Sequence, residues 1–397
     1  MRIIVLTPTF LPAVGGAELV VLQIYRRIAL THKVLILTPH LHENITKNSP
    51  YGEYDDLINF DVQRYIDRFT LMKIRGHKIT CGLIPPFSLS AVFALKKATN
   101  EFKPDVVNVH YVMPTGLAAL YAQKILKIPT VMTYNGRDVP GPGVPKIWKF
   151  WHRLVGSNCQ DMTFVSKYCR DVIYGINSKH GHVIYNGVDN EQNISQEELH
   201  KFCSKVKLNK KTKIIFSLQR LDYLKRVDII IESMPKILNY EKNVCLVVGG
   251  TGPDLTRLKR LVNEKGLENR VIFTEFISHN QLPLYFSMAD IFAFHSTYET
   301  FGMVIAEAMN YRKAIVSANN TAIKEIVDNK INGILVPTMS SDALAEAIID
   351  LLKNDHKRYQ IGNEGKKRVE KLFRWDSIAS KYEVVLENAS STKKIIL

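Results

Sequence analysis

Cysteine is scarce in this sequence, and its pattern excludes the usual cysteine-based sites. The five cysteines are odd in number and widely spaced, and no two form a C-x-x-C pair: Cys81, Cys159, Cys169, Cys203 and Cys245. A disulfide-stapled secreted domain or a zinc finger needs paired, closely spaced cysteines. We therefore expect reduced thiols in a cytoplasmic protein.

Long apolar runs are also missing. No uninterrupted apolar stretch approaches the ~18 residues that a membrane-spanning helix requires. At the N-terminus, Thr7, Pro8 and Pro12 interrupt the apolar region that begins at residue 3. This region predicts a first β-strand and not a secretion signal.

Acidic residues are outnumbered by basic ones. The chain has 53 Lys and Arg residues against 38 Asp and Glu, a net charge of +15, and the excess is spread over both halves. A basic excess favours anionic partners such as nucleic acid, membrane lipid or a phosphorylated substrate. Because the charge is not concentrated in one run and no nucleic-acid-binding motif is present, we do not expect nucleic acid as the partner.

What the sequence does contain is an alternation of short β-branched runs with longer amphipathic segments. The predicted strands are residues 3–6, 34–37, 106–110, 130–134, 162–165, 214–218, 244–248, 271–274, 291–294 and 314–316. The predicted helices are residues 18–29, 115–125, 166–174, 226–238, 255–265 and 302–309. This alternation indicates an α/β protein with parallel sheets covered by helices.

The length of 397 residues exceeds a single hydrophobic core. We predict two Rossmann-like domains facing a cleft, at residues 1–190 and 191–374, because the polar segment from 190 to 213 lacks an apolar stripe. Ile378, Tyr382 and Val385 lie at helical spacing, so residues 375–397 are predicted to form a final helix.

Two glutamates, Glu299 and Glu307, lie eight residues apart around Phe301 and Gly302. The apolar run after Gly302 predicts a helix start, with Glu299 in the preceding loop and Glu307 about a turn and a half inside the helix. The N–H groups of a helix start attract anions such as phosphate, and carboxylates accept hydrogen bonds from hydroxyls. Phosphate beside a polyol is the outline of a nucleotide sugar; the alternative is a surface helix with two solvated glutamates.

The stretch resembles the E-x7-E motif of retaining GT-B glycosyltransferases of the glycosyltransferase family 4 type. The likeness covers nearly the whole chain. Residues 7–18 resemble that family's first strand and Gly-Gly loop, residues 185–189 resemble its inter-domain NGVD, and Arg220 and Lys225 match its R-x4-K pair. The resemblance implies a GT-B fold whose final helix crosses back to the N-terminal domain.

The resemblance also implies roles for the two glutamates. Glu307 would accept hydrogen bonds from ribose hydroxyls, and Glu299, with the amides of Phe301 and Gly302, would hold the sugar of the donor. The donor would be a UDP- or GDP-sugar bound mainly by the C-terminal domain. Transfer to a lipid-linked or glycan acceptor would retain the anomeric configuration through front-face attack.

Arg220 and Lys225 are candidates on physical grounds as well. Arg220 ends the first predicted strand of the second half, and ligands of open α/β sheets bind beyond the carboxyl ends of strands. Two cations there suit a pyrophosphate, because they stabilise the charge that grows on a leaving group. A solvated pair of surface cations is the alternative.

Two glycine-rich loops follow predicted strands. Gly15 and Gly16 would let backbone approach a ligand without a Cβ clash; in the resembling family this loop lies against the donor phosphates and the acceptor. Gly250, in the run Gly-Gly-Thr-Gly-Pro, could pack under the nucleotide, although the run is not G-x-G-x-x-G. A tight structural turn is the alternative reading of both loops.

Asn135 stands where many members of the resembling family carry a histidine near the reacting sugar. Asparagine is neither a general acid nor a general base, but it can donate a hydrogen bond. The nearest replacement is His110 at the end of the preceding strand, either as a catalytic residue or simply as a packed one. Asp138 would orient an acceptor or cap the following segment.

No Asp-x-Asp triplet occurs in the chain. In the other major glycosyltransferase fold this triplet commonly holds a divalent metal on the nucleotide sugar. Its absence predicts metal-independent chemistry in which Arg220 and Lys225 replace the cation, and no cluster with metal-ligand spacing is evident in the sequence.

Residues 146–155 predict an amphipathic helix. Its expected apolar face is Ile147, Trp148, Trp151, Leu154 and Val155, and its expected polar face is Lys149, His152 and Arg153. Such a helix could rest on an anionic bilayer or pack on its own sheet. A second basic stretch is Arg64, Arg68, Lys73, Arg75 and Lys78. We expect peripheral contact with the inner face of a membrane.

Other functions stay open at this stage. One is a sugar-nucleotide epimerase or hydrolase on the same fold, which would need no acceptor. Others are a non-catalytic carbohydrate-binding protein, which the Asn135 substitution permits, and a nucleic-acid-binding protein, which the net charge permits. The sequence favours the glycosyltransferase.

Overall fold

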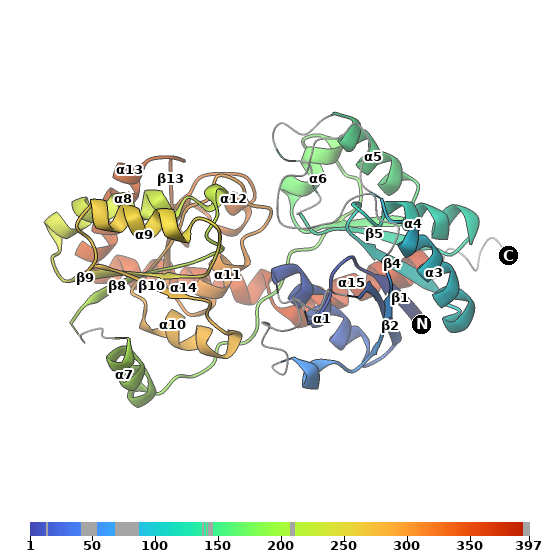
Figure 1. The fold of residues 1–397 in the computed structure, drawn as a ribbon, viewed down its shortest axis with the longest axis horizontal. Coiled ribbons are helices and arrows are strands. Elements are labelled where there is room, and N and C mark those ends of the chain that lie inside the picture. The colour runs from blue at the N-terminus through green and yellow to red at the C-terminus, as the bar shows by residue number, and fades with distance from the viewer. Residues whose placement is uncertain are drawn as a thin grey trace. The chain divides into compact units, whose positions relative to one another are not determined.

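The computed structural model describes residues 1–12, 15–40, 54–67, 87–136, 139, 141, 146–206 and 211–391. The chain divides into two compact units, one made of Met1–Gly187 together with Trp375–Leu397 and one made of Val188–Arg374. Each unit is a parallel β-sheet with helices on both faces (Figure 1).

The first unit contains a seven-stranded sheet in the order β3-β2-β1-β4-β5-β6-β7. Its strands are β1 (Arg2–Leu6), β2 (Lys33–Pro39), β3 (Asp61–Tyr65), β4 (Val106–His110), β5 (Thr130–Tyr134), β6 (Asp161–Phe164) and β7 (His182–Val183). Its helices are α1 (Gly16–Ile28), α3 (Leu89–Phe102), α4 (Gly116–Leu120), α5 (Lys146–Ser157), α6 (Lys167–Tyr174) and α15 (Trp375–Ser391), with a short 3₁₀ turn η2 (Asp55–Leu57) and a π-helical turn η3 (Tyr121–Ile125).

The second unit contains a six-stranded sheet in the order β10-β9-β8-β11-β12-β13. Its strands are β8 (Lys213–Leu218), β9 (Val244–Gly249), β10 (Val271–Glu275), β11 (Ile291–Phe294), β12 (Ala314–Ala318) and β13 (Ile334–Val336). Its helices are α7 (Gln196–Lys205), α8 (Val227–Tyr240), α9 (Leu255–Glu264), α10 (Leu282–Met288), α11 (Met303–Asn310), α12 (Ile323–Ile326), α13 (Ser341–Lys353) and α14 (Asp355–Leu372), with 3₁₀ turns η4 (Tyr223–Lys225) and η5 (His279–Gln281).

The order of strands reverses once in each sheet. In the first sheet the chain builds outward from β1 to β3 and then continues on the other side of β1 with β4, and in the second sheet the same reversal separates β8 from β11. Ligands of doubly wound sheets bind beyond the carboxyl ends of the strands at such a reversal. The topology therefore points to the loops after β1 and β4 and to those after β8 and β11.

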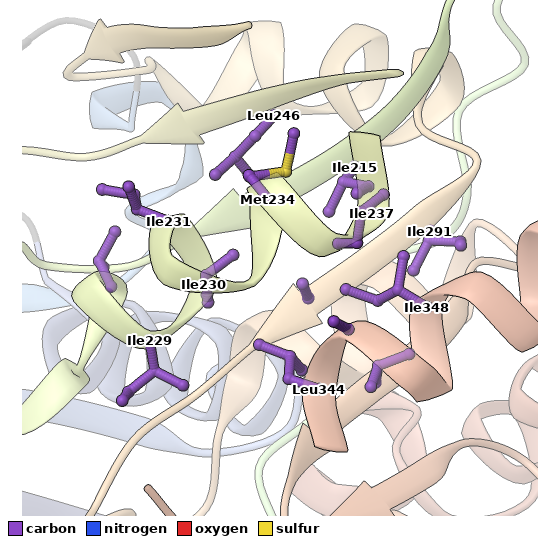
Figure 2. Packing of buried hydrophobic residues seen from close by; sticks show 14 of the residues in the cluster. Ile215, Ile229, Ile230, Ile231, Met234, Ile237, Leu246, Ile291, Leu344 and Ile348 are labelled. Atoms are coloured by element: carbon purple, nitrogen blue, oxygen red, sulfur yellow. The ribbon is translucent and has the colours of Figure 1, made fainter. Parts of the chain in front are cut away.

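The core of the second unit explains why its sheet holds this shape. Helix α8 and helix α13 pack against each other on one face of the sheet, and α10 and α14 lie on the other (Figure 1). Figure 2 shows apolar side chains of α8 and α13 meeting those of the strands beneath them. The fully or almost fully buried members of this cluster include Ile215, Ile230, Met234, Leu246, Ile291, Leu344 and Ile348.

Helix α15 belongs to the first unit although it follows the second along the chain. It packs against α1 and lies over β4 and β5. One face of this helix is buried, including Trp375, Ile378, Tyr382 and Leu386. Ion pairs continue the contact at its edge, as between Arg27 and Asp376 at 2.6 Å.

The structure corrects the predicted faces of α5. Trp148 is 2% exposed and His152 is fully buried, whereas Phe150 is 60% exposed. Trp148 and His152 are four residues apart and therefore share a helix face, and a ring nitrogen of His152 lies 2.6 Å from the carbonyl oxygen of Trp148. The exposed apolar side chains are Ile147 and Leu154, which belong to the predicted apolar face, and Phe150, which does not.

Two further points concern the predicted membrane contact. Of the second basic stretch, Arg64 lies in β3, and the other members, Arg68, Lys73, Arg75 and Lys78, lie outside the described residues. Among the helices of the described ranges, none combines the length and apolarity needed to cross a bilayer.

Candidate active site

Three predicted site residues stand at the strand reversal of the second sheet. Arg220 follows β8, Lys225 ends the turn η4, and Glu299 lies in the loop after β11, which is the strand beside β8. The Nζ atom of Lys225 is 2.5 Å from Oε2 of Glu299, and these side chains are 22% and 14% exposed. The lysine of the R-x4-K pair and the first glutamate of the E-x7-E motif thus form one partly buried ion pair.

Hydrogen bonds hold the two loops of this pair together. The carbonyl oxygen of Leu224, next to Lys225, accepts hydrogen bonds from the backbone N–H of Thr297 at 2.8 Å and from the hydroxyl of Ser296 at 3.2 Å. On the far side, the N–H of Glu299 donates to the hydroxyl of Thr321 at 3.1 Å. These hydrogen bonds fix the backbone at or next to Lys225 and Glu299.

The glycine-rich loop after β9 supports Arg220 from below. A Cβ atom on Gly250 would lie 2.0 Å from the carbonyl oxygen of Gln219, and one on Gly252 would lie 2.1 Å from that of Leu221. Gly250 also has a φ of +116°, a backbone conformation that residues other than glycine rarely adopt. These two glycines therefore let two backbones touch around Arg220, whose side chain is 50% exposed and has its Nε atom 3.6 Å from Oδ2 of Asp222.

The start of α11 follows the predicted pattern. Gly302 is the N-cap with a φ of +99°, and the helix runs over Met303–Asn310. The N–H of Ile305 donates to the carbonyl oxygen of Gly302 at 3.0 Å, whereas the N–H groups of Met303 and Val304 have no acceptor within the helix. Phe301 is 2% exposed and packs edge-on against Phe373 with ring centroids 5.5 Å apart. This contact fixes the helix start beside Glu299.

Glu307 lies in a different environment from Glu299. Its carboxyl group lines a small pocket with Asp189, His279 and Tyr311. Burial raises the pKa of Glu307 to about 7, nearby His279 lowers it and Asp189 raises it. His279 in turn lies 3.4 Å from Asp189. At neutral pH this glutamate is therefore close to its midpoint, with the carboxyl and the carboxylate present in similar amounts.

His279 was not predicted, and Asp189 was named only as part of the inter-domain motif. Asp189 and His279 are 118 and 28 residues before Glu307 along the chain, in a coil and a 3₁₀ turn respectively. No local pattern in the sequence connects them, because their proximity depends on where α10 and α11 pack.

The predicted residues of the first unit lie at or next to its own strand reversal, which separates β1 from β4. Gly15 precedes α1 and Gly16 is its first residue, His110 ends β4, and Asn135 follows β5, the neighbour of β4. Gly15 has extended backbone angles and is the N-cap of α1, without a side-chain cap. His110 is fully buried, whereas Asn135 is only partly buried. Arg137 and Asp138, the next members of that motif, lie outside the described residues.

His110 makes contacts through both ring nitrogens. Its Nε2 atom lies 3.1 Å from the hydroxyl of Tyr25, and its Nδ1 atom lies 3.1 Å from Nδ2 of Asn135. Burial lowers the pKa of His110 to about 4. His110 is therefore neutral at pH 7 and touches Asn135 directly.

Comparison with family models accounts for most of the chain. Residues 200–368 match the model described as glycosyl transferases group 1, and residues 14–192 match the model of glycosyltransferase family 4. An uncharacterised glycosyltransferase of Methanocaldococcus jannaschii is 31% identical over 72% of this chain and 76% of its own length. The alpha-monoglucosyldiacylglycerol synthase of Streptococcus pneumoniae is 25% identical over 94% of this chain and 85% of its own length.

A solved structure shows the same architecture. The Anabaena protein HepE, in complex with UDP, superposes with a TM-score of 0.78 at 20% identity, covering 98% of this chain and 100% of HepE. At this identity the likeness concerns the fold, and it confirms the GT-B fold predicted from the sequence.

Proposed function

Since this chain belongs to the family 4 glycosyltransferases and is a hexosyltransferase, we propose that it takes the sugar from a UDP- or GDP-sugar, passes it to a lipid-linked or glycan acceptor and retains the anomeric configuration. The observation that carries the donor assignment is the Lys225–Glu299 pair beside Arg220 at the reversal between β8 and β11. Two cations, and a carboxylate that can accept hydrogen bonds from hydroxyl groups, lie together where the topology predicts a bound ligand. The UDP in HepE and the lipid in the name of the Streptococcus relative support the choice of donor and acceptor.

Each residue has a defined task in this proposal. Arg220 and Lys225 bind the diphosphate and stabilise the charge that develops on it as it leaves. Glu299, released from Lys225 when the diphosphate binds that lysine, accepts hydrogen bonds from sugar hydroxyls. Glu307 accepts hydrogen bonds from the ribose. The first-turn N–H groups of α11 add a positive dipole end for the anionic donor.

The chemistry that membership of this family implies needs no protein nucleophile. The acceptor oxygen attacks the anomeric carbon on the face from which the diphosphate departs, and a diphosphate oxygen takes the acceptor proton. The bond from the anomeric carbon to the diphosphate breaks as the new glycosidic bond forms, so the configuration is retained.

A membrane-borne acceptor agrees with one surface of the first unit. On α5, Ile147 is 41%, Phe150 60% and Leu154 37% exposed, and Lys146 and Arg153 are exposed on the same helix. We include in the proposal that this stripe rests on an anionic bilayer. Apolar side chains enter the headgroup boundary, and each nearby basic residue contributes about 1 kcal/mol.

The donor and acceptor are tested by a screen of the purified protein. UDP-, GDP- and ADP-sugars are each incubated with lipid and glycan acceptors, and the anomeric configuration of the product is measured by NMR. We expect one donor class to give a glycoside with the configuration of the donor. Consumption of the donor at the same rate with and without an acceptor, and with no glycoside formed, would indicate a hydrolase or an epimerase. A product of inverted anomeric configuration would reject retention.

The division between the two glutamates is tested by calorimetry. Glu307→Ala is expected to weaken binding of the free nucleoside diphosphate and of the whole donor alike. Glu299→Ala is expected to weaken binding of the sugar-bearing donor more than binding of the free diphosphate. Equal losses for both ligands in both variants would reject these roles.

A further inference from the structure

A chain of buried hydrogen bonds leads from the sheet of the first unit to Asn135. The Nδ2 atom of Asn108 donates to the backbone carbonyl of Val131 at 2.8 Å. The hydroxyl of Tyr25 donates to Oδ1 of Asn108 and contacts Nε2 of His110, and Nδ1 of His110 contacts Asn135. Asn108, Tyr25 and His110 are all fully buried.

The backbone carbonyl of Val131, at one end of this series of hydrogen bonds, determines which group donates and which accepts in each of them. A carbonyl oxygen only accepts hydrogen bonds, so Asn108 must turn its Nδ2 toward Val131 and its Oδ1 toward Tyr25. The hydroxyl proton of Tyr25 therefore points at Asn108. The hydroxyl oxygen of Tyr25 is left as an acceptor for His110, whose Nε2 must carry the proton.

The tautomer of His110 then determines the orientation of Asn135. With the proton on Nε2, Nδ1 has a lone pair and needs a donor, which is the Nδ2 group of Asn135. The distances agree, because Nδ1 lies 3.1 Å from Nδ2 and 3.4 Å from Oδ1 of Asn135. Neither group changes its protonation state at neutral pH. Burial lowers the pKa of His110 to about 4, so the ring stays neutral, and burial raises the pKa of Tyr25 well above its ordinary value, so the hydroxyl keeps its proton.

We propose that His110 is a positioning residue which, as the neutral Nε2-protonated tautomer, holds Asn135 so that the carbonyl oxygen of Asn135 faces a hydroxyl group of the bound sugar substrate as an acceptor. The proposal rests on the glycosyltransferase function for its substrate, but the tautomer and the amide orientation do not depend on it. Asn135 lies at the carboxyl end of β5, two strands from the reversal at β1, and is partly exposed.

This assignment reverses the role that the sequence suggests for Asn135. From its chemistry alone the side chain can donate or accept a hydrogen bond. One of the two N–H groups of Nδ2 donates to His110 and fixes the amide, so that Oδ1 is held as an acceptor at the other end of the side chain. A substrate hydroxyl can donate to Oδ1.

The tautomer is measured directly by ¹⁵N NMR of the histidine side chains. The His110 signals are assigned by their loss in His110→Gln. We expect the shifts of a neutral ring protonated at Nε2 from pH 8 down to about pH 5. An imidazolium at pH 7, or a ring protonated at Nδ1, would overturn the proposal whether or not the protein transfers sugar.

The effect on the reaction is measured by a double-mutant cycle. Tyr25→Phe removes the acceptor for His110, and Asn135→Ala removes the amide. Each is expected to lower kcat/KM about three- to tenfold, the effect of one neutral hydrogen bond, with unchanged affinity for the nucleoside diphosphate. The double variant is expected to lose no more than Asn135→Ala alone, because the two residues act through one contact.

Tyr134→Phe is the matched control. Tyr134 is also fully buried in the first unit. Its hydroxyl donates to the backbone carbonyl of His152 at 2.8 Å, which is not one of the hydrogen bonds that link Asn108 to Asn135. Tyr134→Phe is expected to keep kcat/KM and to combine additively with Asn135→Ala. Additive losses for Tyr25→Phe and Asn135→Ala would show a structural role only. Absence of transfer in the wild type would reject the proposed function and leave the NMR result to decide the tautomer.

Discussion

At the scale of the residue, the diphosphate assignment depends on Arg220 and Lys225. We expect Arg220→Ala and Lys225→Ala each to lower turnover by about 10²-fold, as when one transition-state donor is lost. Lys236→Ala is the control, because Lys236 pairs with Asp342 and Glu346 at 3.2 and 2.8 Å on the outer surface of the same unit. Steady-state kinetics check this, and near-normal turnover of both site variants would contradict the assignment.

The pKa of Glu307 predicts how donor binding depends on pH. A ribose hydroxyl donates to a carboxylate, so binding requires the ionised form, and a pKa of about 7 makes affinity rise between pH 6 and pH 8. At pH 6 we expect affinity about tenfold below its plateau, since one pH unit is 1.36 kcal/mol. Glu307→Gln keeps the titration of the diphosphate itself, so the difference between the two proteins in calorimetry isolates Glu307.

The same raised pKa has a consequence for stability without ligand. The unfolded chain ionises near the ordinary value of 4.5, whereas the folded protein keeps the proton until about pH 7. The contribution of Glu307 to stability is therefore undiminished below pH 4.5 and is lost as the pH rises to 7. Glu307→Gln is expected to raise the free energy of unfolding at pH 8 by on the order of 3 kcal/mol, and not at pH 4.

How much of the site could be predicted depends on whether its members share a motif. Lys225 and Glu299 are 74 residues apart, but each follows a strand and belongs to a recognisable pattern. His279 belongs to no such pattern, and the NGVD motif that contains Asp189 does not indicate that Asp189 lies beside Glu307. Their positions follow from helix packing, which a single sequence does not specify.

At the scale of the element, the buried strands were predictable, and among the edge strands β10 was predicted whereas β3 was not. Buried β-branched runs identified β1, β4, β5, β8 and β9 within a residue or so. Strand β3 was missed because it is an edge strand, Asp61–Tyr65, with no fully buried residue. It pairs through its backbone with β2, and backbone pairing leaves no pattern in the side chains.

Helix α5 gives a prediction that separates membrane contact from packing. The triple change Ile147→Gln, Phe150→Gln and Leu154→Gln is expected to lower co-sedimentation with anionic vesicles at least tenfold, since each buried CH₂ is worth ~0.8 kcal/mol. The melting temperature should hold, because these side chains are exposed. Binding should also fall at high salt.

Two controls complete this experiment. Ile176→Gln changes an apolar side chain that is 85% exposed outside α5 and should leave binding intact. Trp148→Ala should lower the free energy of unfolding by about 3–5 kcal/mol, since Trp148 is buried. Failure of the unaltered protein to sediment at low salt would remove the membrane from the proposal.

At the scale of the whole molecule, the cationic pair predicts transfer without a divalent metal. Activity is expected to survive excess EDTA within about twofold, because Arg220 and Lys225 supply the charge that a metal would provide. The described residues do hold a metal-compatible group, His32, Glu383 and Glu387, but His32 precedes β2 and so lies at the amino ends of the strands. If EDTA lowers activity, His32→Ala distinguishes this group from a metal on the donor, and restoration by Mg²⁺ in that variant would contradict the prediction.

Because α15 returns to the first unit, we expect the first unit to complete its fold after the second, although most of it is synthesised first. The second unit is continuous, Val188–Arg374, whereas the first needs Trp375 and the residues after it. At 5–20 residues per second the intervening unit takes on the order of 10–40 s to make. During that time the surface of α1, β4 and β5 that later receives Ile378, Tyr382 and Leu386 is exposed to other proteins.

A truncated protein that ends at Arg374 has the first unit permanently without α15. We expect its second unit to resist proteolysis and its first unit to be cleaved, and adding a peptide of residues 375–391 should restore protection. Equal resistance of both units without the peptide would mean that α15 only decorates a finished core. In the cell, the nascent first half of this enzyme would be a client for chaperones until its last helix leaves the ribosome.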